Sequence, residues 1–255
     1  FSKKYLNLFI SKRSLLIVLI CTCFYGCVQQ PMRNNDLIKD QLNKKVEKSF
    51  SKKNESPNQL EWNLEFSEDF SEINIGDEPE SIFILDGAYT VQSVGLNERC
   101  LLLPGMPMGD FGILFGPRIK DKALELSFSF FASRKGRRMP SVAAGIGGVR
   151  GYRIRLNPAA RKIILSMDET VFKEIPFSWI GDQWWNVRFR ASPSYDSPGL
   201  TSLQFKLWPK IEDEPDKWFL SQEFKVEFAG GKCALWGYPY SSMPILFDDI
   251  KIFSN

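Results

Sequence analysis

The sequence predicts an all-β domain in which two antiparallel sheets pack face to face as a jelly-roll sandwich. From Leu60 onward, apolar and polar residues alternate with a period of two, as in strands with one buried and one solvated face. Turn signals such as Gly147-Gly148 and Asn157-Pro158 separate these segments about every ten to twenty residues. No sustained helical period is present in this part, so crossover helices and a parallel sheet are not expected.

Four segments show the alternation most clearly. They run from Leu124 to Phe130, from Tyr152 to Leu156, from Trp184 to Arg190 and from Leu203 to Trp208. Burying one large apolar side chain stabilises a fold by roughly 1.5–3 kcal/mol, so the apolar phase should face the core. The predicted core residues are Leu124, Leu126, Phe128, Phe130, Ile154, Trp185, Val187, Phe189, Leu203, Phe205 and Leu207.

The first 27 residues are typical of a bacterial lipoprotein signal peptide. A basic start (Lys3, Lys4, Lys12, Arg13) precedes an apolar run that ends at Gly26-Cys27. In such signals the cysteine becomes the lipidated N-terminus, so we expect a membrane anchor at Cys27 and an extracytoplasmic domain in the bacterial cell envelope. An uncleaved anchor helix is the alternative, although Ser14–Val28 is shorter than the roughly 20 residues of a comfortable span.

Residues 28–58 are predicted to be a flexible polar linker, and residues 59–255 the jelly-roll domain. Residues 1–58 contain eleven Lys/Arg and four Asp/Glu residues, a balance of +7. Because the whole chain has a net charge of +3, the domain carries −4. The basic character therefore belongs to the leader and linker, and we expect no nucleic-acid partner.

The chain contains no histidine. This excludes Ser-His-Asp and Cys-His nucleophile activation and histidine-ligated zinc. Of the five cysteines, only Cys100 and Cys233 belong to the domain. They are candidates for a disulfide in an oxidising compartment, and equally for buried free thiols, since both lie in apolar runs.

The order of several motifs resembles a known family. The motifs are Glu68-Asp-Phe-Ser71, Gly151-Tyr-Arg-Ile-Arg-Leu156, Gln183-Trp-Trp-Asn-Val187, Leu203-Gln-Phe-Lys-Leu-Trp-Pro209, Leu235-Trp-Gly-Tyr238 and Phe247-Asp-Asp-Ile-Lys-Ile252. Residues 62–253 resemble the concanavalin A-like lectin/glucanase jelly roll, particularly its versions in bacterial lipoproteins, and more loosely the 3-keto-disaccharide hydrolase domains. The resemblance implies the fold rather than an activity.

The sequence offers no catalytic carboxylate pair of the kind that glycosidases on this fold use. The Glu-x-Asp-x-x-Glu strand pattern of laminarinase-like members is absent, and Glu212–Asp216 is interpreted as a solvated loop. Ala144–Gly151 fits neither the dinucleotide-binding fingerprint nor the P-loop fingerprint, and it is interpreted as a turn between strands. We therefore expect no catalytic residue.

A structural calcium ion between the first and last strands is a further candidate. The carboxylates of Glu68, Asp69, Asp248 and Asp249 supply the oxygen ligands that Ca²⁺ takes, and related jelly rolls often hold such an ion. Asp248 shares its alternation phase with Leu246 and Ile250. Its carboxylate therefore points toward the core unless a β-bulge turns it outward. Turn capping without a metal is the alternative for these acids.

Polar-phase residues of three strands suggest a ligand face. An exposed tryptophan stacks on sugar rings, and arginine pairs with carboxylate or sulfate groups. If the strands share one sheet, the predicted glycan-binding residues lie together: Trp184, Trp208, Arg153, Arg155, Arg188, Arg190, Gln204 and Lys206. The alternative is a solvated face with arginine stems lying over tryptophan.

The sequence thus predicts a lipid-anchored, extracytoplasmic domain that binds a polysaccharide or other glycan without catalysis. A glycoside-acting hydrolase on the same fold and an interaction subunit of an envelope complex are the two alternatives.

Overall fold

All regular structure in the described residues is β-strand. The computed structural model describes residues 61–95, 98–107, 109–136, 138–194, 196–239 and 243–255. Over these ranges it contains fifteen strands and no helix, so the predicted all-β class is confirmed. Nothing in these ranges forms a helix long and apolar enough to cross a membrane. The predicted signal peptide (1–27), the lipidation site Cys27 and the linker (28–58) lie outside the described residues.

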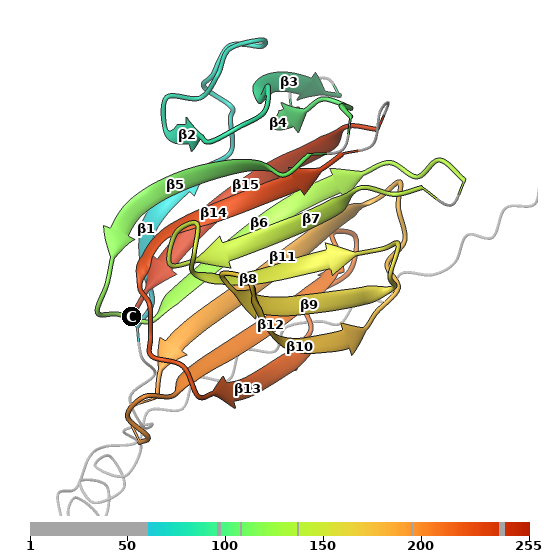
Figure 1. Ribbon diagram of the computed structural model, residues 1–255. Helices are drawn as coiled ribbons and strands as arrows, with labels where there is room; N and C mark the ends of the chain where they lie inside the picture. The colour runs from blue at the N-terminus through green and yellow to red at the C-terminus, as the bar shows by residue number, and fades with distance from the viewer. Residues whose placement is uncertain (1–60, 96–97, 108, 137, 195, 240–242) are drawn as a thin grey trace, which may run out of the picture. The chain divides into compact units, whose positions relative to one another are not determined.

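Eight strands form one sheet, here called sheet A. Their order is β13-β12-β11-β6-β15-β4-β3, with β1 paired to β15, and all neighbours are antiparallel (Figure 1). The strands are β1 (Asn63–Glu68), β3 (Thr90–Val94), β4 (Glu98–Leu103), β6 (Leu124–Ala132), β11 (Trp184–Pro193), β12 (Thr201–Pro209), β13 (Leu220–Phe224) and β15 (Ile245–Ser254).

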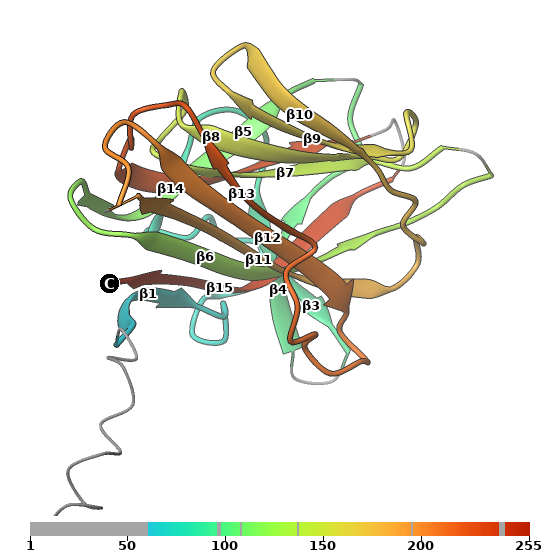
Figure 2. The ribbon, with the colours of Figure 1, turned by 90° about the horizontal axis from the view of Figure 1, so that it is seen from below.

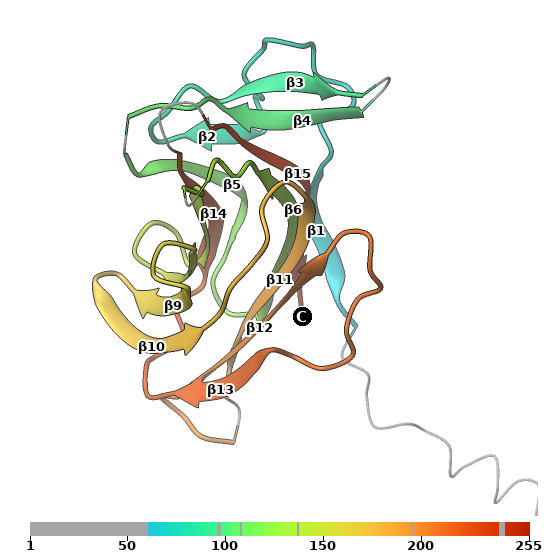
Figure 3. The same ribbon diagram turned by 90° about the vertical axis from the view of Figure 1, so that its right-hand side faces the viewer.

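Seven strands form the opposing sheet, sheet B. Their order is β10-β9-β8-β7-β14-β5-β2, again with antiparallel neighbours. The strands are β2 (Ile82–Ile84), β5 (Phe111–Ile119), β7 (Ser141–Ile146), β8 (Tyr152–Asn157), β9 (Lys162–Met167), β10 (Thr170–Pro176) and β14 (Gly231–Tyr238). In Figure 2, β8–β10 lie in one layer while β6, β11 and β15 lie in the other, and Figure 3 shows β9 and β10 apart from β6, β11 and β15.

One apolar core fills the space between the two sheets. All eleven predicted core residues are buried, from Leu124 at 0% exposure to Leu207 at 9%. The period-two alternation therefore predicted the inward phase of these strands correctly. The sheets and their core lie within Leu60–Asn255, which forms a compact unit by itself and is a suitable fragment for binding experiments.

A β-bulge interrupts the alternation of β15. The pairing register with β6 shifts between Asp248 and Lys251, and Asp249 has a positive φ of 52°. Ile245 and Phe247 face the core before the bulge, and Ile250 and Ile252 face it afterwards. Asp248 is paired with Ser129, an outward residue of β6, so the bulge turns its carboxylate away from the core.

The two domain cysteines are free thiols. Cys100 lies in β4 of sheet A and Cys233 in β14 of sheet B, and both are buried. Burial raises the pKa of each thiol to about 12, so neither is a thiolate at neutral pH.

Candidate functional site

The predicted ligand face is divided between the two sheets. Trp184, Arg188 and Arg190 on β11, and Gln204, Lys206 and Trp208 on β12, do share the outer face of sheet A. Arg153 and Arg155 belong to β8 in sheet B, so the prediction of one common surface is wrong for these two residues. The reason is the segment between β10 and β11, which carries the chain from one sheet to the other.

The outer face of sheet A is held together by a buried carboxylate. The side chain of Glu125 is 3% exposed, and its Oε1 lies 2.5 Å from Nη1 of Arg188. Its Oε2 accepts hydrogen bonds from Arg190 Nε at 2.9 Å and Nη2 at 2.5 Å. Buried charges are tolerated when they are paired in this way, so the predicted ligand arginines already have a partner within the sheet.

The loop between β12 and β13 adds a second carboxylate to this face. Glu214 contacts Arg188 Nη2 at 2.9 Å and Lys206 Nζ at 2.7 Å. Lys206 is 7% exposed and Trp208 8% exposed. The open tryptophan platform expected at Trp208 is therefore wrong, because the side chain is a packing residue.

Aromatic rings cover much of what remains on the same face. The guanidinium carbon of Arg190 lies 4.3 Å from the ring centre of Trp62 and 4.8 Å from that of Trp218. Trp184 is half-buried against Phe131, with Lys210 Nζ 5.3 Å from its ring centre. These stacks correspond to the alternative in which arginine and lysine cover tryptophan.

The four acids proposed to share a calcium ion are each engaged elsewhere. Glu68 accepts from the backbone N of Phe70 and from Ser81, and Asp69 accepts from Ser71. Lys210 Nζ lies 2.7 Å from Asp249 and 3.8 Å from Asp248. Burial, and then the charge of Asp249, raise the pKa of Asp248 to about 6. No group of three acidic, cysteine or histidine ligands converges within the described ranges, so the predicted set does not fit one cation.

Sheet B carries two arginine–aromatic stacks on its outer face. The guanidinium carbon of Arg153 lies 3.7 Å from the ring centre of Trp236, and that of Arg155 lies 3.8 Å from the ring centre of Tyr238. A Cβ added at Gly112 would come within 2.6 Å of the Trp236 indole. The ring therefore lies flat on the sheet and is only 3% exposed beneath Arg153.

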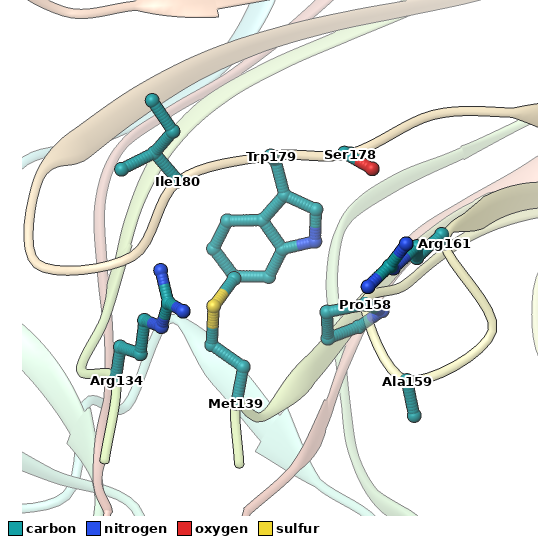
Figure 4. Close-up of a pocket in the computed structure, with 8 residues that line it drawn as sticks. All are labelled: Arg134, Met139, Pro158, Ala159, Arg161, Ser178, Trp179 and Ile180. Carbon is teal, nitrogen blue, oxygen red and sulfur yellow. The ribbon is translucent and has the colours of Figure 1, made fainter. Parts of the chain in front are cut away.

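A cavity of about 650 Å³ lies among three loops of the sandwich. Trp179 forms its floor with Met139, and Arg134 and Arg161 lie on opposite sides of the indole (Figure 4). The cavity is lined by Arg134 and Met139 from the β6–β7 loop, Pro158, Ala159 and Arg161 from the β8–β9 turn, and Ser178, Trp179 and Ile180 from the β10–β11 loop. We call it the Trp179 pocket.

Backbone hydrogen bonds fix the three walls relative to one another. Arg134 N donates to Asp182 Oδ1 at 2.9 Å, and Asp182 N donates to the carbonyl of Ala132 at 3.0 Å. Phe177 N donates to the carbonyl of Arg161 at 2.9 Å. At Gly181 a Cβ would meet Arg134 Cβ at 2.8 Å, so glycine allows this close approach. The pocket is therefore largely preformed.

The indole of Trp179 is held by the core but keeps one unsatisfied polar atom. Its ring packs edge-on against Phe130 at 5.3 Å and against Trp185 at 6.5 Å, measured between ring centres. The side chain is 7% exposed, and its buried Nε1 has no hydrogen-bond partner among the described residues. In Figure 4 this nitrogen is on the side of Pro158 and Arg161. An unpaired buried N–H costs about 1–3 kcal/mol. Because this nitrogen is buried, a ligand in the preformed pocket does not reach it.

A smaller cavity of about 260 Å³ adjoins the same turn. It shares Ala159 with the Trp179 pocket and is lined also by Arg155, Asn157 and Tyr238. Burial, followed by the charge of Asp110, raises the pKa of Tyr238 to about 12, so its hydroxyl stays protonated. The two cavities share Ala159 as a lining residue and so offer adjacent positions for an extended ligand.

Comparison with known proteins identifies the fold. No protein-family model and no curated protein matches the sequence. Among solved structures, the metal-free carbohydrate recognition domain of Emp46p is similar with a TM-score of 0.53 and 12% identity, over 76% of this chain and 98% of that one. The carbohydrate recognition domain of Emp47p is similar with a TM-score of 0.51 and 7% identity, over 78% of this chain and 100% of that one. The fold is that of the concanavalin A-like lectins.

The resemblance inferred from the motif order is therefore confirmed for the fold. A potassium-bound form of the Emp46p domain is also similar, with a TM-score of 0.52 and 13% identity, over 75% of this chain and 98% of that one. Identities at this level establish the lectin fold alone, so the binding residues have to be argued from the site itself.

Sequence reasoning missed Trp236 and the aromatic residues that line the two cavities, Trp179 and Tyr238. Trp236 and Tyr238 alternate with the core residues Cys233 and Leu235, so strand periodicity alone was a usable signal for their outward phase. Trp179 had no such signal, because it lies in a loop between Ser178 and Ile180, both of which are exposed.

Proposed function

We propose that this domain binds a glycan, with one sugar unit in the Trp179 pocket. The observation that carries the proposal is the preformed pocket, in which the Trp179 indole is set between two arginines (Figure 4). A volume of about 650 Å³ falls in the range of ligand pockets, roughly 300–1,000 Å³. The similar carbohydrate recognition domains support this class of ligand.

The lining residues match the two kinds of surface that a sugar presents. The apolar face of a pyranose ring packs on an indole, while its hydroxyl groups need hydrogen-bond donors and acceptors. Trp179 and Met139 are 7% and 8% exposed, so they offer only a small apolar contact at the base of the pocket, and Ile180 at the rim adds exposed apolar surface. Arg134, Arg161 and Ser178 provide polar groups around it. The neighbouring cavity beside Arg155 and Tyr238 offers a place for the next unit of a chain.

The proposed activity is binding without hydrolysis. Glycoside hydrolysis needs two carboxyl groups on either side of the scissile bond. None of the described residues that line the Trp179 pocket is an aspartate or a glutamate. The proposal also includes no cation, since the candidate acids of the first and last strands are engaged by backbone, serine and lysine donors.

The proposal predicts that Trp179→Phe weakens glycan binding at least about tenfold. The change keeps an aromatic ring at the base of the pocket but removes part of the indole that contacts the cavity. A glycan array on residues 60–255 identifies a ligand, and isothermal titration then compares the variant with Trp218→Phe, which alters the outer face of sheet A. Because the smaller ring also affects packing, the rim variant Ile180→Ser is measured as well, since Ile180 is 64% exposed and contributes little to the core. Unchanged affinity in both pocket variants, or an equal loss in Trp218→Phe, would place the site elsewhere.

We further propose that the domain works outside the cytoplasm, anchored to a membrane by lipid on Cys27. The basic start, the apolar run and the Gly26-Cys27 junction support this placement. Changing Cys27 to serine is expected to release the protein from the membrane fraction or to stall processing, as seen by fractionation and mass spectrometry of the N-terminus. Full retention of the variant with its leader attached would instead indicate an uncleaved anchor.

A further inference from the structure

Six of the 21 lysine and arginine side chains in the described part of the domain have a carboxylate partner, and the two arginines of the Trp179 pocket belong to the larger group without one. Arg153, Lys162, Arg188, Arg190, Lys206 and Lys210 each lie within 4.0 Å of an acidic side chain. Among the described residues, Arg134 and Arg161 have no such ion pair. Arg134 donates from Nε to the carbonyl of Gly136 at 2.8 Å, and its two terminal nitrogens make no hydrogen bond or ion pair with another described residue.

The surroundings of the pocket reinforce this positive charge. Arg134, Lys135 and Arg138 are exposed on one loop, and Arg161 is exposed on the facing turn. Asp182, whose Oδ1 accepts the backbone N–H of Arg134, lies beside this group and offsets one of these four positive charges. The domain as a whole carries −4, so a local excess of positive charge here is not a property of the average surface.

The backbone at Arg161 has a left-handed conformation. Its φ is +52°, in the left-handed region that glycine and asparagine occupy with least strain. The turn is closed by Arg161 N donating to the carbonyl of Pro158, so this conformation is built into the hairpin. Asparagine is therefore expected to fit this position at least as well as arginine.

We infer that the sugar bound in the Trp179 pocket carries a negatively charged group, a carboxylate or a sulfate. The inference rests on the proposed function and names the chemical class of its ligand. Arg134 and Arg161 approach such a group from opposite sides of the indole, and guanidinium forks pair with carboxylate and sulfate oxygens.

The test compares acidic and neutral oligosaccharides of the same backbone. Oligogalacturonate is titrated against its carboxyl-reduced form, and sulfated dextran oligomers against dextran, using residues 60–255. We expect at least one acidic ligand to bind ten times more tightly than its neutral counterpart, with an affinity that falls as salt increases. A preference confined to the uronate or to the sulfate identifies which group the pocket takes.

Two variants assign the preference to the pocket. Arg134→Gln and Arg161→Asn are each expected to weaken binding of the acidic ligand about tenfold while leaving the melting temperature unchanged. Asparagine is chosen at 161 because it tolerates a positive φ. Arg118→Gln, at an exposed position of β5, is the matched control and should retain affinity.

The outcomes separate this inference from the proposal beneath it. Equal affinity for acidic and neutral ligands, or an equal loss in Arg118→Gln, overturns the acidic preference and leaves glycan binding standing. Absence of binding to any glycan on the array, acidic or neutral, overturns both.

Discussion

Replacing Glu125 with glutamine is expected to lower the free energy of unfolding by about 3 kcal/mol. The carboxylate lies within sheet A, where its side chain is 3% exposed, and it receives Arg188 and Arg190 together. Removing one partner of a buried ion pair costs roughly 3–5 kcal/mol because the remaining charge stays desolvated. The arginine side chains are 27% and 23% exposed, so partial solvation places the expected cost at the lower end of that range.

Urea denaturation of the Glu125→Gln variant measures this loss against a matched control. Glu174 makes an ion pair with Lys162, but the two side chains are 49% and 30% exposed. Exposed pairs contribute about 1 kcal/mol or less, so Glu174→Gln should change the free energy of unfolding only slightly. Equal effects of the two substitutions would show that the Glu125 cluster is solvated and does not organise sheet A.

Strand periodicity predicted the core of this domain well because each strand buries one continuous face. β6, β11 and β12 alternate without interruption, and their inward residues are all buried. Strand periodicity predicts less at β15, where the bulge at Asp248 and Asp249 adds a residue and reverses which alternate positions face the core. Sequence alternation left both orientations of Asp248 open there, since a bulge cannot be distinguished from a buried polar residue without its partner strand.

The candidate site was less predictable because it depends on which strands become neighbours. β8 and β11 have the same kind of polar phase, with arginine in both, yet they lie in different sheets. The Trp179 pocket, in turn, is made by three loops that only the folded sandwich brings together. A loop tryptophan carries no periodic signal, so neither its burial nor its arginine neighbours could be predicted from the sequence.

Trp208→Ala is expected to destabilise the domain by about 3 kcal/mol and to leave the affinity for glycan unchanged. Trp208 was predicted to be an exposed stacking residue, but the side chain is 8% exposed on the outer face of sheet A. Truncating a buried tryptophan to alanine costs about 3–5 kcal/mol, from the lost apolar contacts and the cavity left behind. The slight remaining exposure again favours the lower end of that range.

The decisive comparison sets this variant against Trp179→Phe in two assays. Chemical denaturation should show the larger loss for Trp208→Ala, whereas titration of the folded protein should show the larger loss of affinity for Trp179→Phe. This difference follows from their positions, because Trp208 lies on a sheet face closed by Glu214 and Lys206 while Trp179 lines a cavity. If Trp208→Ala abolished binding in protein that remains folded, the outer face of sheet A would be the ligand surface after all, and the Trp179 pocket would lose its assigned role.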